Sequence, residues 1–186
     1  MGRRRYGEAM TSIERVDPPL AADEAATLRG FLDYHRATLL RKTDGLTQEQ
    51  LNQPLAPSDM TLGGMVKHVA FNEHWWFSCV LHGAEYAEPW ASVDWDADSD
   101  WEWHTARDDT PEQLRALLDG HIAESDELID RALADGGLDT LSARASSRRG
   151  VQFSLRWIIT HMIEEYARHN GHADLIRQSI DGATGE

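Results

Sequence analysis

Residues 155–180 read LRWIITHMIEEYARHNGHADLIRQSI, and their apolar side chains recur at the spacing of one helix face. Steps of four and three residues alternate, which is typical of a helix buried against other helices. The repeat consists of Leu155, Ile159, Met162, Tyr166, His169, Ala173, Ile176 and Ile180. His169 stands where a hydrophobic residue is expected, and Glu165 precedes it by one turn. Both side chains can reach one divalent cation, and a third ligand from another helix would complete an open metal site.

Three further stretches predict amphipathic helices, over residues 22–44, 60–82 and from a cap at Thr110 to Gly136. Thr110 is followed by a proline and a glutamate, which is a typical helix start. A short helical turn is predicted at Thr47. The fourth helix is expected to begin near Phe153, and no strand-like alternation competes with these helices. The sequence therefore predicts an all-α fold, an antiparallel four-helix bundle with one long crossover loop.

The connection over residues 83–109 reads as irregular and contains four tryptophans among aspartates. Alternating aspartates suggest calcium, but the glycine and the final glutamate that a calcium loop requires are missing. A solvated connection or a lid over a cavity is the better interpretation. Gly63 and Gly64, near the start of the second helix, weaken that helix and indicate the close approach of a neighbouring group.

Length and charge limit the class of protein. The 186 residues form one domain, expected over residues 22–182 and preceded by a mobile lead-in over residues 1–21. A net charge of −14 argues against nucleic acid or an anionic membrane as partner. No apolar run is long enough to span a bilayer, and a single cysteine fits a reducing compartment, so a cytoplasmic protein is expected. Cys79 lies in an apolar run without a lysine or arginine close in sequence and is expected to be buried and structural.

The histidines have two possible interpretations. His161 and His172 share the sector of His169 on the last helix, and His68 lies beside packing positions of the second helix. Buried histidines commonly hydrogen-bond to a neighbouring group, and this interpretation remains open for each of them. His35 and His121 occupy similar interior positions and either line a cavity near a metal or hydrogen-bond to a neighbouring helix.

The segments LRWIITHMIEEYARHNGHADLIR, TLGGMVKHVAFNEHWWF, ERVDPPLAADE and FLDYHRATLLRK together give a resemblance. They resemble the DinB/YfiT-like superfamily over residues 15–182, in particular its actinobacterial branch known as mini-circle protein or as a domain of unknown function. The resemblance implies a DinB-like four-helix bundle, commonly a homodimer. It also implies a divalent metal held by one ligand from the second helix and two from the last helix.

Carried over by position, the resemblance implies that the metal ligands are His68, Glu165 and His169. A glutamate at the first position of the last-helix pair is similar to the mycothiol-dependent maleylpyruvate isomerases. This ligand set suits zinc, with nickel, manganese or iron as alternatives. His172 replaces part of the usual tail and stands as a fourth ligand, a proton shuttle or a partner of a ligand. His35 is the other candidate catalytic residue if it lies near the site, because the unperturbed pKa of a histidine side chain is near neutrality.

The function that follows is a metal-dependent thiol S-transferase or detoxifying enzyme that joins a mycothiol-type thiol to an electrophile. Asn72, Trp75 and Trp76, with tryptophans of the 90–103 loop, are the candidate substrate-binding residues. A metal-dependent hydrolase is a close alternative. A non-enzymatic protein that sequesters a small molecule and a purely structural protein are alternatives of other classes.

Overall fold

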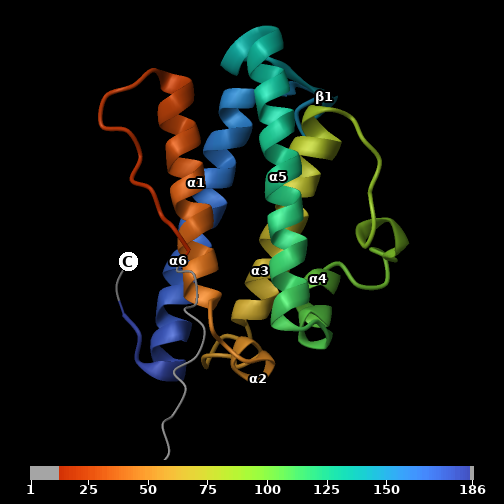
Figure 1. Cartoon of the computed structure of the whole chain (residues 1–186). Helices are drawn as coiled ribbons and strands as arrows, with labels where there is room; N and C mark the ends of the chain where they lie inside the picture. Colours follow the sequence, from red (N-terminus) through yellow and green to blue (C-terminus); the bar gives the residue numbers. More distant parts are fainter. Residues whose placement is uncertain (1–12, 185–186) are drawn as a thin grey trace, which may run out of the picture.

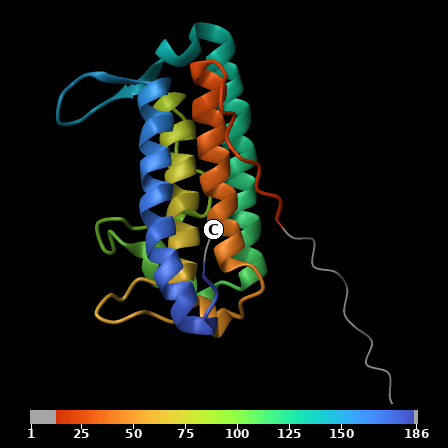
Figure 2. The same ribbon diagram turned by 90° about the vertical axis from the view of Figure 1, so that its left-hand side faces the viewer.

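The computed structural model describes residues 13–184, and this part of the chain is mostly helical, as predicted. Four long helical segments lie side by side (Figure 1 and Figure 2). The helices and strands are α1 (Glu24–Thr43), α2 (Gln48–Leu51), α3 (Leu62–Glu73), α4 (Trp101–Thr105), α5 (Pro111–Gly136), β1 (Leu141–Ala145), β2 (Gln152–Ser154) and α6 (Leu155–Asp181).

The directions of these helices explain the long crossover. The His82 ring bonds to the carbonyl oxygen of Leu128, and His74 lies beside His121, so α3 and α5 run the same way. Two adjacent helices that run the same way cannot be joined by a tight turn. The chain therefore returns along the length of the molecule through residues 82–110, which include α4 (Figure 1).

Local sequence sets most of the helix boundaries. Thr110 and Thr47 begin α5 and α2 with capping boxes, in which the threonine side chain and a glutamine three residues later satisfy each other's backbone N–H groups. Ser154 caps the start of α6. Gly182, which follows the last residue of the helix and has a φ of 79°, caps its end. The four predicted long helices and the predicted turn at Thr47 are thus confirmed, with boundaries shifted by about two residues.

Three local features differ from the sequence prediction. Residues His74–Leu81 continue α3 as a π-helix, which widens the last turns of that segment. Residues 83–109 are not wholly irregular, because α4 forms within them. The connection before α6 contains an antiparallel pair, β1 and β2, where no strand was expected; it lies in the segment that projects from the helices in Figure 2. Short strands of this kind give too little alternation to be recognised.

A buried ion pair ties the long helices together. The guanidinium of Arg36 in α1 donates two hydrogen bonds of 2.7 Å to the carboxylate of Glu73 in α3. The hydroxyl of Tyr166 in α6 donates to the same carboxylate at 2.8 Å, and Asp126 of α5 accepts from Arg36 at 2.8 Å. Burial alone would lower the pKa of Arg36, but the Glu73 carboxylate outweighs it and raises that pKa. Burial, and then the charge of Glu73, hold the pKa of Tyr166 well above its usual value.

The described part of the predicted lead-in lies against the helices. Ile13 packs on the core, and Arg15 donates to the Thr38 hydroxyl at 3.2 Å. Residues 1–12 of that lead-in lie outside the described residues. No helix formed by residues 13–184 has the length and hydrophobicity that crossing a bilayer requires.

Replacing Glu73 by alanine should lower the free energy of unfolding by about 3 kcal/mol or more, because it leaves the Arg36 charge buried without its main partner. Urea unfolding followed by circular dichroism measures this change. Glu164→Ala is the matched control, since Glu164 pairs with Arg168 on the exposed surface of α6 and should contribute little. Equal effects of the two substitutions would contradict the assigned role of the buried pair.

Candidate metal centre

The three predicted ligands lie together between α3 and α6. One ligand atom from each of His68, Glu165 and His169 lies within 4.8 Å of the others. The rings of His68 and His169 meet edge to face, with centroids 5.1 Å apart. α3 and α6 run in opposite directions here, since Trp76, two turns after His68, packs on Trp157, three turns before His169. Glu165 and His169 on α6 therefore lie beside His68 on α3, the residue predicted as the third ligand.

Glu102 of α4 fixes the orientation of the His68 ring. Nδ1 of His68 lies 2.9 Å from Oε1 of the buried Glu102, and the Asn72 amide nitrogen lies 3.1 Å from Nε2. Both contacts are satisfied when Nδ1 carries the hydrogen and Nε2 keeps its lone pair. A histidine whose other nitrogen donates to a carboxylate is the usual form of a metal-ligating histidine.

Sequence reasoning missed Glu102, because it placed the residue in an irregular acidic loop. A glutamate between Trp101 and Trp103, in a run otherwise rich in aspartate, was the available signal. The flanking tryptophans pack against the hydrophobic core, and Glu102 between them is buried. The buried Lys67 also holds this segment, donating to Thr105 at 3.0 Å and to Asp109 at 2.6 Å.

The electrostatics of the centre favour neutral histidine. Burial, followed by the neighbouring His68 and His172, lowers the pKa of His169 to about 4. Its imidazole is therefore neutral at pH 7, which is the form that binds a metal. Nδ1 of His169 is buried without a hydrogen-bond partner in the described structure, and Glu165 Oε2 lies 3.7 Å from Nε2.

The residues present fit a divalent metal. Two imidazoles and a carboxylate are a common donor set for zinc and related ions, and three protein ligands leave a coordination position open. Ligand atoms about 2.1 Å from one ion are at most about 4 Å apart. The ligand atoms of His68, Glu165 and His169, all within 4.8 Å of one another, lie close to this range.

The predicted substrate-binding residues divide between two places. Asn72 touches His68, and Trp76 packs on His161, with centroids 4.8 Å apart, one turn from Glu165. Trp75 points elsewhere: it packs on Tyr86 and lies under the guanidinium of Arg144. Trp103, in the crossover, is the tryptophan that contacts the candidate ligands, with its ring centroid 4.8 Å from that of His68.

The two candidate catalytic histidines also separate. The His172 ring lies 5.7 Å from that of His169, and its Nδ1 is buried without a hydrogen-bond partner in the described structure. His35 lies on α1 against Asn170, whose amide nitrogen donates to the His35 carbonyl oxygen at 3.0 Å. The groups of candidate ligands found within residues 13–184 include neither histidine.

A second cluster with similar composition is held in a different state. His74, His121 and Glu124 also lie within 4.8 Å of one another. Nε2 of His74 accepts from the Ala87 N–H at 3.0 Å, and Nε2 of His121 accepts from the Trp90 indole at 3.2 Å. In each neutral ring Nδ1 therefore carries the hydrogen and faces Glu124, and the lone pair of Nε2 is held by a backbone or a buried indole N–H, which cannot turn away as the Asn72 side chain beside His68 can. His121 thus takes the second of its two interpretations, a core histidine bonded to a neighbour.

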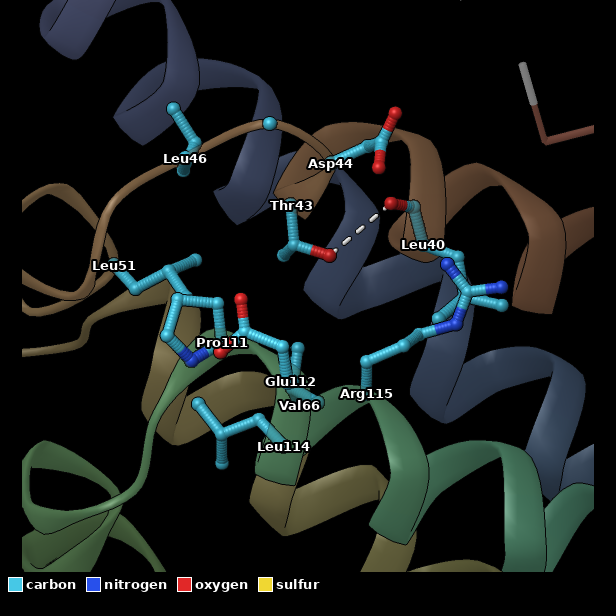
Figure 3. Close-up of a pocket in the computed structure, with 11 residues that line it drawn as sticks. Leu40, Thr43, Asp44, Leu46, Leu51, Val66, Pro111, Glu112, Leu114 and Arg115 are labelled. Atoms are coloured by element: carbon cyan, nitrogen blue, oxygen red, sulfur yellow. Dashed lines mark hydrogen bonds between the residues drawn. The ribbon is translucent and has the colours of Figure 1, made fainter. Parts of the chain in front are cut away.

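One cavity lies away from all these residues. It has a volume of about 380 Å³ and is formed by the end of α1, α2, α3 and the start of α5. Figure 3 shows Leu51, Val66 and Leu114 on one side, and Thr43, whose hydroxyl bonds to the Leu40 carbonyl oxygen, on the other. None of the predicted ligand, catalytic or substrate-binding residues lines this cavity.

Gly64 and Cys79 behave as their sequence contexts predict. A Cβ on Gly64 would lie 2.6 Å from the Trp103 ring, so the glycine allows the close approach that was expected. Cys79 is fully buried, and burial raises the pKa of its thiol to about 11. The predicted structural role of Cys79 is consistent with both properties.

A family model described as Mycothiol-S-transferase matches residues 27–182. The match covers most of the chain, so the chain belongs to this family, a member of the DinB-like superfamily that the sequence motifs resemble. A comparison with curated proteins found no match.

The Cys79 thiol should react with iodoacetamide much more slowly in the folded protein at pH 8 than in urea, because it is buried and almost wholly protonated. Mass spectrometry of the alkylated protein over time measures the two rates. Because burial depresses the thiolate fraction, native labelling should speed up as the pH approaches 11. Rapid labelling of the folded protein at pH 7 would show that the thiol is accessible and activated.

Proposed function

We propose that this member of the mycothiol-S-transferase family is a metal-dependent thiol S-transferase in which His68, Glu165 and His169 hold the metal. The observation that carries the proposal is the convergence of these three side chains, with the His68 ring oriented by Glu102. Zinc suits the donor set best, and nickel, manganese or iron would also bind. When bound, such a metal lowers the pKa of a thiol and so supplies a thiolate nucleophile.

In the proposed reaction, the sulfur of mycothiol bonds to a carbon of the electrophile. The leaving group departs with the bonding electron pair, and the thiol proton is released. No cysteine of this chain is needed as the nucleophile, which agrees with the burial and the raised pKa of Cys79.

An aromatic cluster beside the ligands is the proposed site for an apolar electrophile. Trp76 packs against Phe153 and Trp157, each with ring centroids 5.3 Å from its own. Trp157 is 45% exposed, so this cluster is accessible from the solvent. His161 joins this cluster to Glu165, whose Oε1 lies 3.8 Å from His161 Nε2. The electrophile would thus lie against Trp76 and Trp157, about two to three turns of helix from the metal ligands.

Several further features belong to the same proposal. The side-by-side helices with their long crossover support a DinB-like four-helix bundle over residues 22–182, although the predicted antiparallel order does not hold for α3 and α5, which run the same way. We propose a homodimer, as the resemblance implies, and a cytoplasmic location, as the single cysteine suggests. His172 is the better placed of the two candidate catalytic residues, because its ring is next to that of His169.

The ligand set is tested by His68→Ala, Glu165→Gln and His169→Ala. Each should remove most of the bound metal and reduce the conjugation of mycothiol to an alkylating electrophile at least a hundredfold. Elemental analysis of untagged protein and product formation followed by mass spectrometry measure the two effects. His82→Ala is the control, because His82 bonds to the Leu128 carbonyl oxygen away from the centre.

Full metal content and turnover in His68→Ala would overturn the proposal. The same assays distinguish the alternative functions. Product formed from the electrophile without any thiol would indicate a hydrolase. Tight capture of a small molecule that is recovered unchanged after denaturation would indicate a sequestering protein.

Glu102→Gln tests the orientation of His68. The amide is a weaker acceptor than the carboxylate and should weaken metal binding by about 10- to 100-fold without abolishing it. Competition with a chromogenic chelator measures the affinity. Asp98→Asn is the matched control on the same segment, because Asp98 pairs with the exposed His104 instead of with a candidate ligand. Equal affinities of the two variants would remove Glu102 from the centre.

A further inference from the structure

A second cavity lies beside the candidate metal centre, and the proposed function above assigns no ligand to it. We name it the Trp103 pocket; its volume is about 610 Å³. This volume lies within the range of about 300–1,000 Å³ that small-molecule sites occupy. Its lining includes Asn52, Asp59, Asp100, Trp103, His104 and Arg107.

Trp103 separates this pocket from the candidate ligands. Its indole lines the pocket and also packs on His68 and His169, with centroids 4.8 Å and 5.7 Å away. The indole of Trp103 packs directly against Gly64, where any side chain larger than hydrogen would clash with it. A molecule in the pocket is therefore about one indole ring away from the two histidines.

The lining favours one class of ligand. Acidic side chains, an amide and a guanidinium line the pocket together with an indole, so donors and acceptors are both present, and Pro54 and Met60 add apolar surface. The carboxylates of Asp59 and Asp100 disfavour an anionic ligand, and so many polar groups disfavour a purely apolar one. A ring with many hydroxyl groups satisfies both conditions, because its hydroxyls reach the polar side chains while its C–H face packs on the indole.

We propose that the Trp103 pocket binds the hydroxyl-rich, sugar-like body of the thiol substrate, with the sulfur directed past Trp103 to the metal centre. This inference rests on the proposed function, because it assigns the thiol to this side of the centre. The electrophile then approaches from the aromatic cluster of Trp76 and Trp157 on the other side. The ligands His68 and His169 lie between the polar pocket and the apolar cluster.

The main experiment compares two thiols. Mycothiol carries its N-acetylcysteine on a glucosamine–inositol unit, and free N-acetylcysteine lacks that unit. The wild-type protein should prefer mycothiol, and Asp59→Ala with Asp100→Ala should reduce the ratio of the two kcat/KM values at least tenfold, mainly through KM for mycothiol. The matched control is Asp96→Ala, an exposed aspartate of the same segment that does not line the pocket.

A binding measurement separates this inference from the proposed function. Glucosaminylinositol without the cysteine should bind the wild-type protein and the Asp96→Ala variant in ligand-observed NMR, and should bind the double variant at least tenfold more weakly. Binding of this form in a protein that transfers no thiol would contradict the proposed function but support the pocket. The inference would be overturned if the double variant and the Asp96→Ala control had the same ratio of kcat/KM values for the two thiols and bound glucosaminylinositol equally well. Both variants must be folded and hold their metal for this comparison.

Discussion

The buried contact between Arg36, Glu73 and Tyr166 is the constraint on which the arrangement of the helices depends. It joins α1, α3 and α6 directly and reaches α5 through Asp126. Because each partner is buried, a rotation or a shift of one helix would leave a charge or a hydroxyl unpaired. Glu73 follows His68 by five residues, and Tyr166 directly follows Glu165. The same contact therefore fixes the two helices that bring the candidate ligands together.

The direction of the helices has a second consequence for the centre. Because α3 and α5 run the same way, the chain needs a long return, and this return places α4 against α3. Glu102 then reaches His68, and Trp103 covers Gly64 and faces the candidate ligands. A segment that topology requires thus supplies the carboxylate that orients a ligand and the indole that borders the neighbouring pocket. The long crossover serves as part of the centre as well as a connection.

Two of the histidine–glutamate clusters, one with His68 and one with His74, show that composition does not decide what a site can bind. Each contains two histidines and one glutamate within 4.8 Å. Backbone and indole N–H groups occupy Nε2 of His74 and His121, which leaves hydrogens facing Glu124. His68 Nε2 also accepts a hydrogen bond, but its donor is the side-chain amide of Asn72, which can rotate away and release the lone pair, while Glu102 accepts from Nδ1. The hydrogen-bond partners of each ring, rather than the residue types, make one cluster suited to a metal.

The sequence by itself determined the helices, because apolar periodicity and caps such as Thr110 act within a few residues of the chain. It also placed Glu165 and His169 on one helix face, since their spacing of one turn is local. Only the tertiary structure decided which residues distant in sequence lie beside the predicted site residues. Glu102 contacts His68, whereas His35 contacts Asn170 and Trp75 packs on Tyr86. These outcomes depend on the rotation of each helix and on the path of the crossover. Such contacts join residues far apart in sequence, and no local pattern encodes them.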